Sequence, residues 1–396
     1  MAAARDEGSP PGALDGVRVL EFASYVSGPF AGMLLADLGA EVIKIENPAG
    51  GDPFRDWGRS DYNGTFGSMN RNKRSVTLNL KTPEGREAAR RLARDADVIV
   101  ENFRSGVMDG LELGYEALAA ENPGLIYCSI TGFGGEGPYE DRPGYDTVGQ
   151  AMSGLLGVLT DRTAPQPMGV SLSDHLAGAF AAYGVLAALQ ARQRTGTGQR
   201  VETSLLQATL AFMGENSATY FEDQRLPSRA SRCQRAQVFA FTGSDGLPFV
   251  VHLSSPPKFW TGLLTAISME RLGEDPRFAT RPKRVANYNL LAASLQERFT
   301  TRPRNEWLAL LGDKDVPSAP INSLEEVFAD PQVEALGLKV SLPHPRRGTV
   351  SVVANPVRLS ATPAHYATSA PDLGADNEAI LNGVGVGGRQ VFPGVD

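Results

Sequence analysis

The sequence predicts an α/β protein: a doubly wound parallel sheet forms the larger domain, and a smaller α+β domain follows it. Short apolar runs typical of buried strands alternate with helical segments over about the first 130 residues. A pair of strands joined by a tight turn at 237–253 then follows a basic stretch at 227–235 that is typical of a linker. The chain of 396 residues also exceeds the roughly 250–300 residues at which a single core stops growing, so two domains are expected.

The first elements form a βαβ unit. Strand 17–22 leads through a turn at Gly28 and Pro29 into helix 30–38, which returns to strand 41–45. The loop lacks the G-x-G-x-x-G pattern of dinucleotide-binding proteins, although Glu46 stands at the end of the second strand. An NAD-dependent dehydrogenase is therefore a distant alternative.

The same alternation continues to residue 130. We expect a strand at 76–80, a helix from Thr82 to about Asp95 with proline in its first turn, and strands at 97–100 and 125–130. The ligand crevice of a doubly wound sheet lies beyond the carboxyl ends of its strands. The loops at 24–28, 101–104 and 131–137 should therefore share one rim.

The second half of the chain is mainly helical. A helix begins near Asp146, and a long apolar helix begins near Asp174 and ends at 194–198. A strand at 199–204 and a helix at 205–220 precede the linker. Helices follow the strand pair to about Leu311, and 349–359 is expected to contain two strands.

Composition excludes several classes of protein. Net charge is −7 and the basic residues are scattered, which argues against nucleic acid as a partner. Cys128 and Cys233 are far apart and form no metal-binding pattern, so neither a disulfide framework nor a metal site is expected. The first residues include acids and no apolar signal segment, and there is no run of 18 apolar residues. We expect a cytoplasmic protein without membrane contact.

Two polar features have both a structural and a functional interpretation. Asp174 is a lone carboxylate at the junction of a loop and the long apolar helix, where it could simply cap the helix. The segment Met69-Asn-Arg-Asn-Lys-Arg-Ser75 is either an anion contact or a solvated basic turn.

Eight segments, in this order and spacing, carry a family resemblance. They are Leu14-Asp-Gly-Val-Arg-Val-Leu20, Asp37-Leu-Gly-Ala-Glu-Val-Ile-Lys-Ile-Glu46, Asn72-Lys-Arg-Ser75, Val100-Glu-Asn-Phe103, Ser129-Ile-Thr-Gly-Phe-Gly134, Gly196-Thr-Gly-Gln199, and Val316-Pro-Ser-Ala-Pro-Ile-Asn322 with Asp330-Pro-Gln-Val333. From about Leu14 to the C-terminus the chain resembles the class III CoA-transferases, a group that includes the formyl-CoA transferases and the alpha-methylacyl-CoA racemases.

The resemblance implies an architecture. It comprises a Rossmann-like large domain built from both ends of the chain, a small α+β domain from the middle, and ring-shaped subunits in an interlocked homodimer. We accordingly expect a disordered tail at 1–12, the N-terminal part of the large domain at 13–224, the small domain at 225–330, and a return segment at 331–396 that completes the large domain.

The resemblance also implies site residues. Asp174 matches the acyl-accepting aspartate, and Asp146 matches an acidic position, although it could equally be a second helix cap. Coenzyme A contacts carry over to Ser24, Tyr25, Leu78, Lys81, Asn102 and Phe103. Arg74 is a further candidate for coenzyme A, and Arg55 and Arg71 are candidates for a substrate carboxylate, because a forked guanidinium suits either anion.

The expected reaction moves CoA from an acyl-CoA to a free carboxylic acid, with a dicarboxylic acid as one candidate because of these arginines. The Asp174 carboxylate would attack the thioester and form an anhydride, and the CoA thiolate would return to give an aspartyl-CoA thioester. We expect no permanent cofactor or metal, because carboxylates and thiolate are already ionised near neutral pH. Val26, Asn47, Gly110 and the segment 254–258 depart from the formyl-CoA transferases, so formate or oxalate specificity is not implied.

Two other functions fit the same fold: an acyl-CoA racemase, and an acyl-CoA binder without catalysis. Racemisation needs two bases, and the related racemases use a histidine where this chain has Tyr145. A tyrosine with a pKa near 10 is a poor base at neutral pH. His175 is adjacent to Asp174, and neighbouring side chains on a helix point about 100° apart, so His175 should face elsewhere. The sequence favours CoA transfer.

Overall fold

A computed structural model of the chain describes residues 11–58 and 63–382. Two compact units divide it: the larger combines Met1–Leu156, Pro167–Gly214 and Glu334–Asp396, and the smaller combines Gly157–Gln166 and Glu215–Val333. Most of the tail expected at 1–12 lies outside the described residues, and the domain boundaries expected from the sequence stay predictions.

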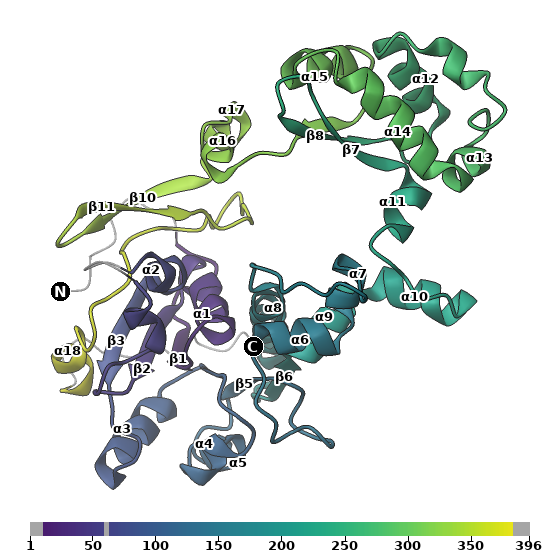
Figure 1. The fold of residues 1–396 in the computed structure, drawn as a ribbon. Coiled ribbons are helices and arrows are strands. Elements are labelled where there is room, and N and C mark those ends of the chain that lie inside the picture. Colours follow the sequence, from purple (N-terminus) through teal and green to yellow (C-terminus); the bar gives the residue numbers. More distant parts are fainter. Residues whose placement is uncertain (1–10, 59–62, 383–396) are drawn as a thin grey trace. The chain divides into compact units, whose positions relative to one another are not determined.

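A six-stranded parallel sheet is the centre of the larger unit (Figure 1). Its spatial order is β3-β2-β1-β4-β5-β6, and each neighbouring pair is parallel. The strands are β1 (Arg18–Phe22), β2 (Glu41–Glu46), β3 (Lys73–Thr77), β4 (Val98–Glu101), β5 (Ile126–Thr131) and β6 (Arg200–Ser204). This is the doubly wound order, in which the chain reverses its direction of progress between β1 and β4.

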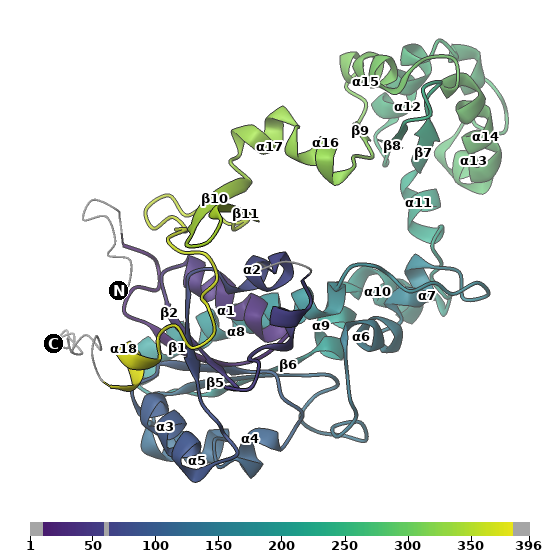
Figure 2. The same cartoon turned by 60° about the vertical axis from the view of Figure 1, so that its left-hand side comes forward.

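Helices cover both faces of this sheet (Figure 1). On one face α1 (Ser27–Asp37) and α8 (Leu172–Thr195) bury small apolar side chains against it, among them Ala31, Leu35, Ala177, Ala181 and Val185. On the other face α3 (Pro83–Arg94) and α5 (Tyr115–Glu121) contribute Ala89, Ala93 and Leu118. Near the C-terminus α18 (Asn377–Leu381) lies beside β3 (Figure 2).

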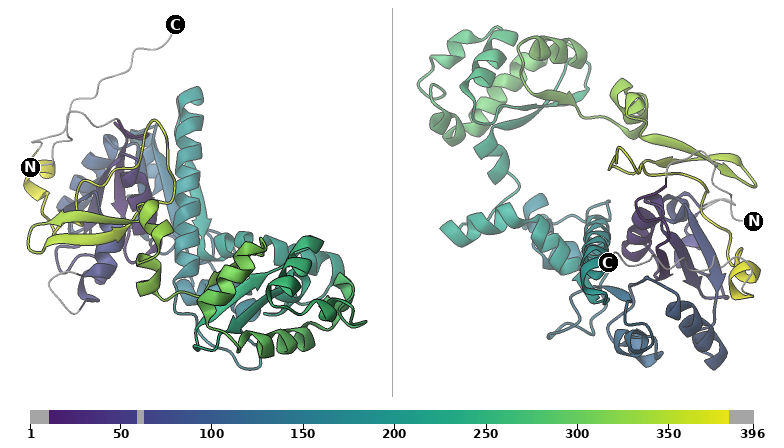
Figure 3. Two further views of the ribbon diagram at one scale, coloured as in Figure 1. Left: turned by 90° about the horizontal axis from the view of Figure 1, so that it is seen from above. Right: turned by 180° about the vertical axis from the view of Figure 1, so that it is seen from behind.

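The long helix α8, teal in Figure 3, belongs to this core. Among the described helices it is the one that length and composition would allow to cross a membrane. Its buried residues pack against α1, β5 and β6. Gly178 lets α8 approach α1 closely, because a Cβ at this position would lie 2.5 Å from the Ser27 carbonyl oxygen.

The smaller unit contains a three-stranded antiparallel sheet, β7 (Val238–Thr242), β8 (Pro248–His252) and β9 (Ser318–Pro320). The hairpin expected at 237–253 is thus confirmed, and β9 adds a strand that we did not expect. Aromatic rings fill its core, where Phe299 lies 4.5 Å from Phe241 and 5.2 Å from Trp307 between ring centroids. Its helices are α12 (Pro257–Ala266), η2 (Glu270–Gly273), α13 (Arg281–Ala286), α14 (Tyr288–Phe299), α15 (Arg304–Asp313) and α16 (Leu324–Phe328).

Two expectations in the N-terminal half were wrong. Strand β3 begins at Lys73 and not at residue 76, because the basic side chains before Val76 find acidic partners inside the sheet. Gly28 and Pro29 lie in the first turn of α1 and not in a turn before it. Proline is tolerated there because the backbone N–H that it lacks would have no partner at the start of a helix.

Three expectations further along the chain also need correction. The helix expected at 205–220 divides at Met213 into α9 (Leu205–Phe212) and α10 (Gly214–Asp223). The expected linker contains most of a short helix, α11 (Ser231–Ala236). In place of two strands within 349–359, β11 (Gly348–Val353) pairs with the earlier strand β10 (Lys339–His344).

The remaining short elements lie in the connections. They are η1 (Pro53–Asp56), α2 (Gly64–Asn70), α4 (Val107–Gly110), α6 (Asp146–Met152), α7 (Leu155–Leu159) and α17 (Pro331–Ala335).

Candidate active site

A pocket of about 270 Å³ lies in the larger unit, where β1, β4 and β5 end. Its walls are Ser24–Ser27, Asn102–Ser105, Ile130–Gly132, Arg142–Tyr145, Pro53, Glu140, Asp174 and Leu205. Ligands of doubly wound proteins bind at this switch point, between the strands on either side of the reversal. The expectation that the loops after these three strands share one rim is confirmed.

Asp174 reaches the pocket from the first turn of α8. Ser171 is the N-cap residue of this helix, so the capping interpretation of Asp174 is not supported. The close packing of α8 on α1 at Gly178 sets the start of α8 beside the loop after β1. The carboxylate is therefore held at the ends of the parallel strands.

Asp146 supports the same turn of α8. Its Oδ1 accepts a hydrogen bond from the Asp174 backbone N–H at 3.2 Å, and its Oδ2 accepts one from Gln150 Nε2 at 2.6 Å. Gln150 also donates to the Val170 carbonyl oxygen at 2.9 Å, which ties α6 to the segment before α8. Asp146 is the first residue of α6, yet it satisfies a free N–H of the neighbouring helix α8.

The pKa of Asp174 is raised to about 7, first because burial disfavours the charged carboxylate and second because Asp146 repels it. The ionisation of Asp174 is therefore sensitive to pH near neutrality. This departs from the expectation that the carboxylate is already ionised near neutral pH.

Asn102 joins the loop after β4 to the loop after β1. Its Oδ1 accepts from the Ser24 backbone N–H at 3.0 Å, and its Nδ2 donates to the Ser24 carbonyl oxygen at 2.8 Å and to Ser27 Oγ at 3.1 Å. The preceding residue, Glu101, accepts from the Phe103 N–H at 2.9 Å, and burial raises its pKa to about 7. These bonds fix the pocket wall that contains Ser24, Asn102 and Phe103.

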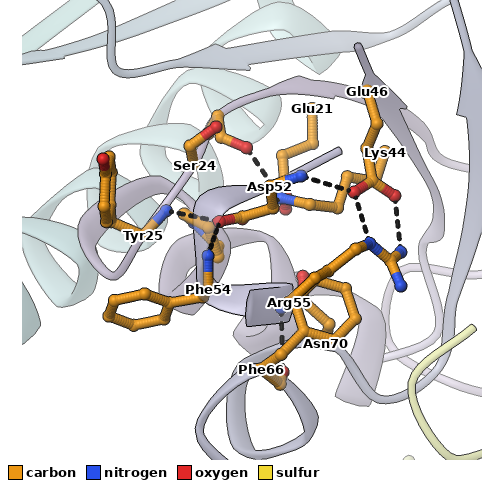
Figure 4. Close-up of polar contacts among 12 residues, drawn as sticks. Glu21, Ser24, Tyr25, Lys44, Glu46, Asp52, Phe54, Arg55, Phe66 and Asn70 are labelled. Carbon is orange, nitrogen blue, oxygen red and sulfur yellow. Dashed lines mark hydrogen bonds and ion pairs between the residues drawn. The ribbon is translucent and has the colours of Figure 1, made fainter. Parts of the chain in front are cut away.

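Tyr25 forms another wall and has an unusual backbone conformation. Its φ is 66°, in the left-handed region, and its N–H donates to Asp52 Oδ1 at 3.1 Å (Figure 4). The ring packs edge-on against Phe54 at 5.5 Å and against Tyr145 at 5.8 Å between centroids. The position of this ring depends on Asp52.

A buried set of charges holds Asp52 in place (Figure 4). Lys44 Nζ lies 3.0 Å from Asp52 Oδ2 and 2.8 Å from Glu21 Oε1, and it donates to the Ala23 carbonyl oxygen at 2.7 Å. Burial disfavours the charged amine of Lys44, but Glu21 and Asp52 outweigh this and raise its pKa. Lys73 pairs with Glu21 at 2.7 Å, and burial lowers the pKa of Lys73 to about 8.

The three arginines proposed from the sequence all have acidic partners elsewhere. Arg71 is buried and binds Asp37 through two bonds of 2.8 and 2.6 Å. Arg55 binds Glu46 through two bonds of 2.8 and 2.7 Å, and Arg74 pairs with Glu41 at 2.8 Å and with Asp376 at 3.1 Å. The pocket walls include none of these arginines. The basic segment at 69–75 thus pairs with internal acids.

Glu46 is the acid at the end of the second strand that left an NAD-dependent dehydrogenase as an alternative. Like the three arginines, it already has partners within the chain. Besides Arg55, it accepts from the Asp52 N–H at 3.0 Å and from Ser75 Oγ at 2.7 Å. It is almost wholly buried. Burial alone would raise its pKa, but Arg55 lowers it overall.

The other residues expected at the site divide between the pocket and its surroundings. Ser24, Tyr25, Asn102, Phe103 and Asp174 line the pocket. Leu78 is buried in the core beneath α3, and Lys81 is exposed after β3; neither belongs to the walls. The described residues contain no group of three or more His, Cys, Asp or Glu placed to hold a metal ion.

His175 faces away from the pocket. Its Nδ1 donates to the Ser171 carbonyl oxygen at 2.6 Å, and its ring packs edge-on against Phe30 at 4.8 Å. The pocket walls include Tyr145 but not His175.

Sequence reasoning missed two arginines that do line the pocket, Arg104 and Arg142. Across the described part of the chain, no carboxylate lies within 4.0 Å of either guanidinium. Both stand in loops that follow strand ends, next to segments that the sequence had already singled out, which is the signal that could have identified them. They are the arginines left open to an anion in this pocket.

Comparisons with known proteins agree with this geometry. A family model described as CoA-transferase family III matches residues 14–377. A succinyl-CoA–D-citramalate CoA-transferase of Chloroflexus aurantiacus is 37% identical, over 94% of both chains. A succinate–glutarate CoA-transferase of Agrobacterium fabrum is also 37% identical, over 94% of this chain and 95% of that one. The crystal structure of a CAIB/BAIF family protein from Brucella suis superposes with a TM-score of 0.84 at 38% identity and covers 95% of this chain and 100% of that one.

Proposed function

Because this chain belongs to CoA-transferase family III, we propose that it moves CoA between an acyl-CoA and a dicarboxylic acid, with Asp174 as the nucleophile. The observation that carries this proposal is the carboxylate of Asp174, partly buried in a pocket at the switch point of the sheet. A carboxylate in that place can accept an acyl group and then CoA.

Each step of the proposed reaction conserves charge and atoms. An Asp174 oxygen attacks the thioester carbon, the C–S bond breaks, and CoA thiolate and an acyl-aspartyl anhydride result. The thiolate then attacks the Asp174 carbonyl carbon, which releases the donor acid as its carboxylate and leaves an aspartyl-CoA thioester. The acceptor carboxylate repeats these two steps in reverse, so the product acyl-CoA leaves and Asp174 is free again.

A dicarboxylic substrate is supported by two independent observations. The similar proteins carry names that refer to succinate, glutarate and citramalate, all dicarboxylic acids. The pocket also contains arginines with no acidic partner among the described residues, which can neutralise a second carboxylate.

The proposal is tested by an exchange assay. The protein receives succinyl-CoA and a panel of free mono- and dicarboxylic acids, and new CoA esters are followed by mass spectrometry. We expect transfer to dicarboxylic acids, and we expect hydroxylamine to trap Asp174 as a hydroxamate when no acceptor is present. Asp174→Ala should abolish exchange and still bind CoA. Wild-type exchange rates in that variant would refute the mechanism.

The racemase alternative is weaker because the described pocket walls contain no histidine to act as the second base. Tyr145 occupies the position of the expected histidine, and His175 faces Phe30. We expect no exchange of the alpha proton of a 2-methylacyl-CoA in heavy water. Rapid deuterium uptake without CoA transfer to any acid would establish the racemase instead.

We also propose that the chain acts as a homodimer. The support is an apolar stripe on α8, formed by the exposed side chains of Phe180, Tyr183 and Leu186. Residues three apart on a helix lie on one face. A contiguous apolar surface of this kind is typical of a protein interface.

A further inference from the structure

We propose that Arg142 binds the carboxylate of the dicarboxylic substrate that does not react, and so selects diacids over monoacids. This inference rests on the function proposed above and assigns its substrate selection to one residue.

The acidic side chains in and behind the pocket make a cation necessary for binding a dicarboxylic acid. Asp174 and Glu140 line it, and Asp146 lies directly behind Asp174. A diacid brings a carboxylate that reacts and a second one that stays negative throughout the reaction. Placing that second anion beside acidic side chains is unfavourable unless a positive group pairs with it. A monoacid has no second carboxylate and therefore needs no such positive partner.

The backbone sets Arg142 at the pocket. Gly144 packs against Gly132 at the end of β5 so closely that a Cβ on Gly144 would lie 2.7 Å from the Gly132 Cα. Arg142 precedes this contact by two residues, and Asp146, which hydrogen-bonds the Asp174 N–H, follows it by two. Four residues span at most about 14 Å, which limits the separation of Arg142 from Asp146, and Arg142 and Asp174 line the same pocket.

An aromatic support orients the guanidinium. The Arg142 Cζ lies 3.9 Å from the centroid of the Tyr139 ring, and that ring packs edge-on against Phe133 at 5.9 Å. A guanidinium stacked on a ring keeps its N–H groups free at its edge. These donors can take a carboxylate through two parallel hydrogen bonds.

Arg142 is also available, unlike the arginines proposed from the sequence. Arg55, Arg71 and Arg74 each bind a carboxylate of this chain at 2.8 Å or less. No acid of the described residues lies within 4.0 Å of Arg142. Arg104 is equally unpaired, but it directly follows Asn102 and Phe103 on the wall formed by the loop after β4. Arg142 belongs to the segment that leads into Asp146.

The test compares acceptors of equal length, glutarate and valerate, with succinyl-CoA as the donor. The two half-reactions are separate, so kcat/KM for the acceptor does not depend on the donor. We expect Arg142→Gln to lower kcat/KM for glutarate about 10- to 100-fold, the usual effect of losing hydrogen bonds to a charged group. The value for valerate should change less than about threefold, and Arg142→Lys should fall in between because it keeps the charge without the fork.

Three further variants sharpen the result. Tyr139→Leu should reproduce part of the loss for glutarate, and Tyr139→Phe, which keeps the ring, should not. Arg104→Gln should leave the ratio of glutarate to valerate unchanged, whatever it does to both rates. Thermal unfolding of each variant checks that it is folded.

The outcomes separate the inference from the function on which it rests. If the wild type forms glutaryl-CoA and Arg142→Gln keeps the wild-type preference for glutarate, the inference is wrong and the proposed function stands. It is also wrong if Arg104→Gln, and not Arg142→Gln, removes the preference. If the wild type transfers CoA to no dicarboxylic acid, the proposed function itself fails.

Discussion

The pKa of Asp174 makes a kinetic prediction at the scale of single residues. Only the carboxylate attacks the thioester, so kcat/KM for the acyl-CoA should rise with pH through about 7 and level off above it. Asp146→Asn should move this rise to lower pH, because it removes the negative charge that repels the ionised form. A pH profile of initial rates measures both. A rise that stays in place in Asp146→Asn would show that burial alone raises the pKa.

The same shift predicts an effect on stability. The unfolded carboxyl ionises near 3.8 and the folded one near 7, so the folded state holds more protons between these values and loses stability as pH rises through them. Asp174→Asn should therefore be more stable than wild type at pH 8, by on the order of 2–4 kcal/mol. The difference should shrink to less than about 1 kcal/mol at pH 4, where the folded carboxyl is protonated and the unfolded one is about half ionised.

Denaturant titrations at the two pH values measure this difference. Asp174→Ala is a less suitable comparison, because it also removes side-chain volume. An advantage of Asp174→Asn that is equal at pH 4 and pH 8 would contradict the raised pKa.

At the scale of elements, the buried charges connect β1 and β2 to a wall of the pocket. Lys44→Met should destabilise the protein by about 3–5 kcal/mol, because Glu21 and Asp52 would keep buried charges without their shared partner. It should also raise KM for acyl-CoA, since Asp52 holds the Tyr25 backbone. The exposed Lys339 on β10 is the matched control, and Lys339→Met should change stability by less than about 0.5 kcal/mol.

Chemical denaturation and initial-rate kinetics on both variants test this connection. A loss of stability in Lys44→Met with unchanged KM would mean that Tyr25 keeps its place without the charge network.

At the scale of the whole molecule, the proposed homodimer, interlocked as the family resemblance implies, makes a prediction of its own. Interlocked ring-shaped subunits can separate only by unfolding, so the mass of two chains should persist on dilution to nanomolar concentration. Light scattering or mass photometry measures this directly. A species with the mass of one chain at that concentration would contradict the interlock and leave the chemistry of Asp174 untouched.

Local patterns were sufficient for the main elements of the large sheet. Short apolar runs predicted β1, β2, β4 and β5 to within about two residues, since buried parallel strands need continuous apolar stretches. The more polar strand β6 was also predicted to within one residue. The rule that parallel strands end at one edge then placed their loops on a common rim. Asp174 stood out as an acid at the start of a largely apolar helix, but its role as nucleophile was implied by the family resemblance and not by this pattern.

Only the tertiary structure shows which charged side chains are already paired within the chain and which are free to bind a ligand. The partners of Arg71 and Arg74 lie 34 and 302 residues away, so no local pattern showed that these arginines were already paired. The raised pKa of Asp174 arises from burial and from a neighbour 28 residues away. Ion pairing and desolvation depend on distances in space. The sequence therefore determined the sheet and pointed to Asp174, and the folded chain decided that Arg142, and not Arg71, lines the pocket.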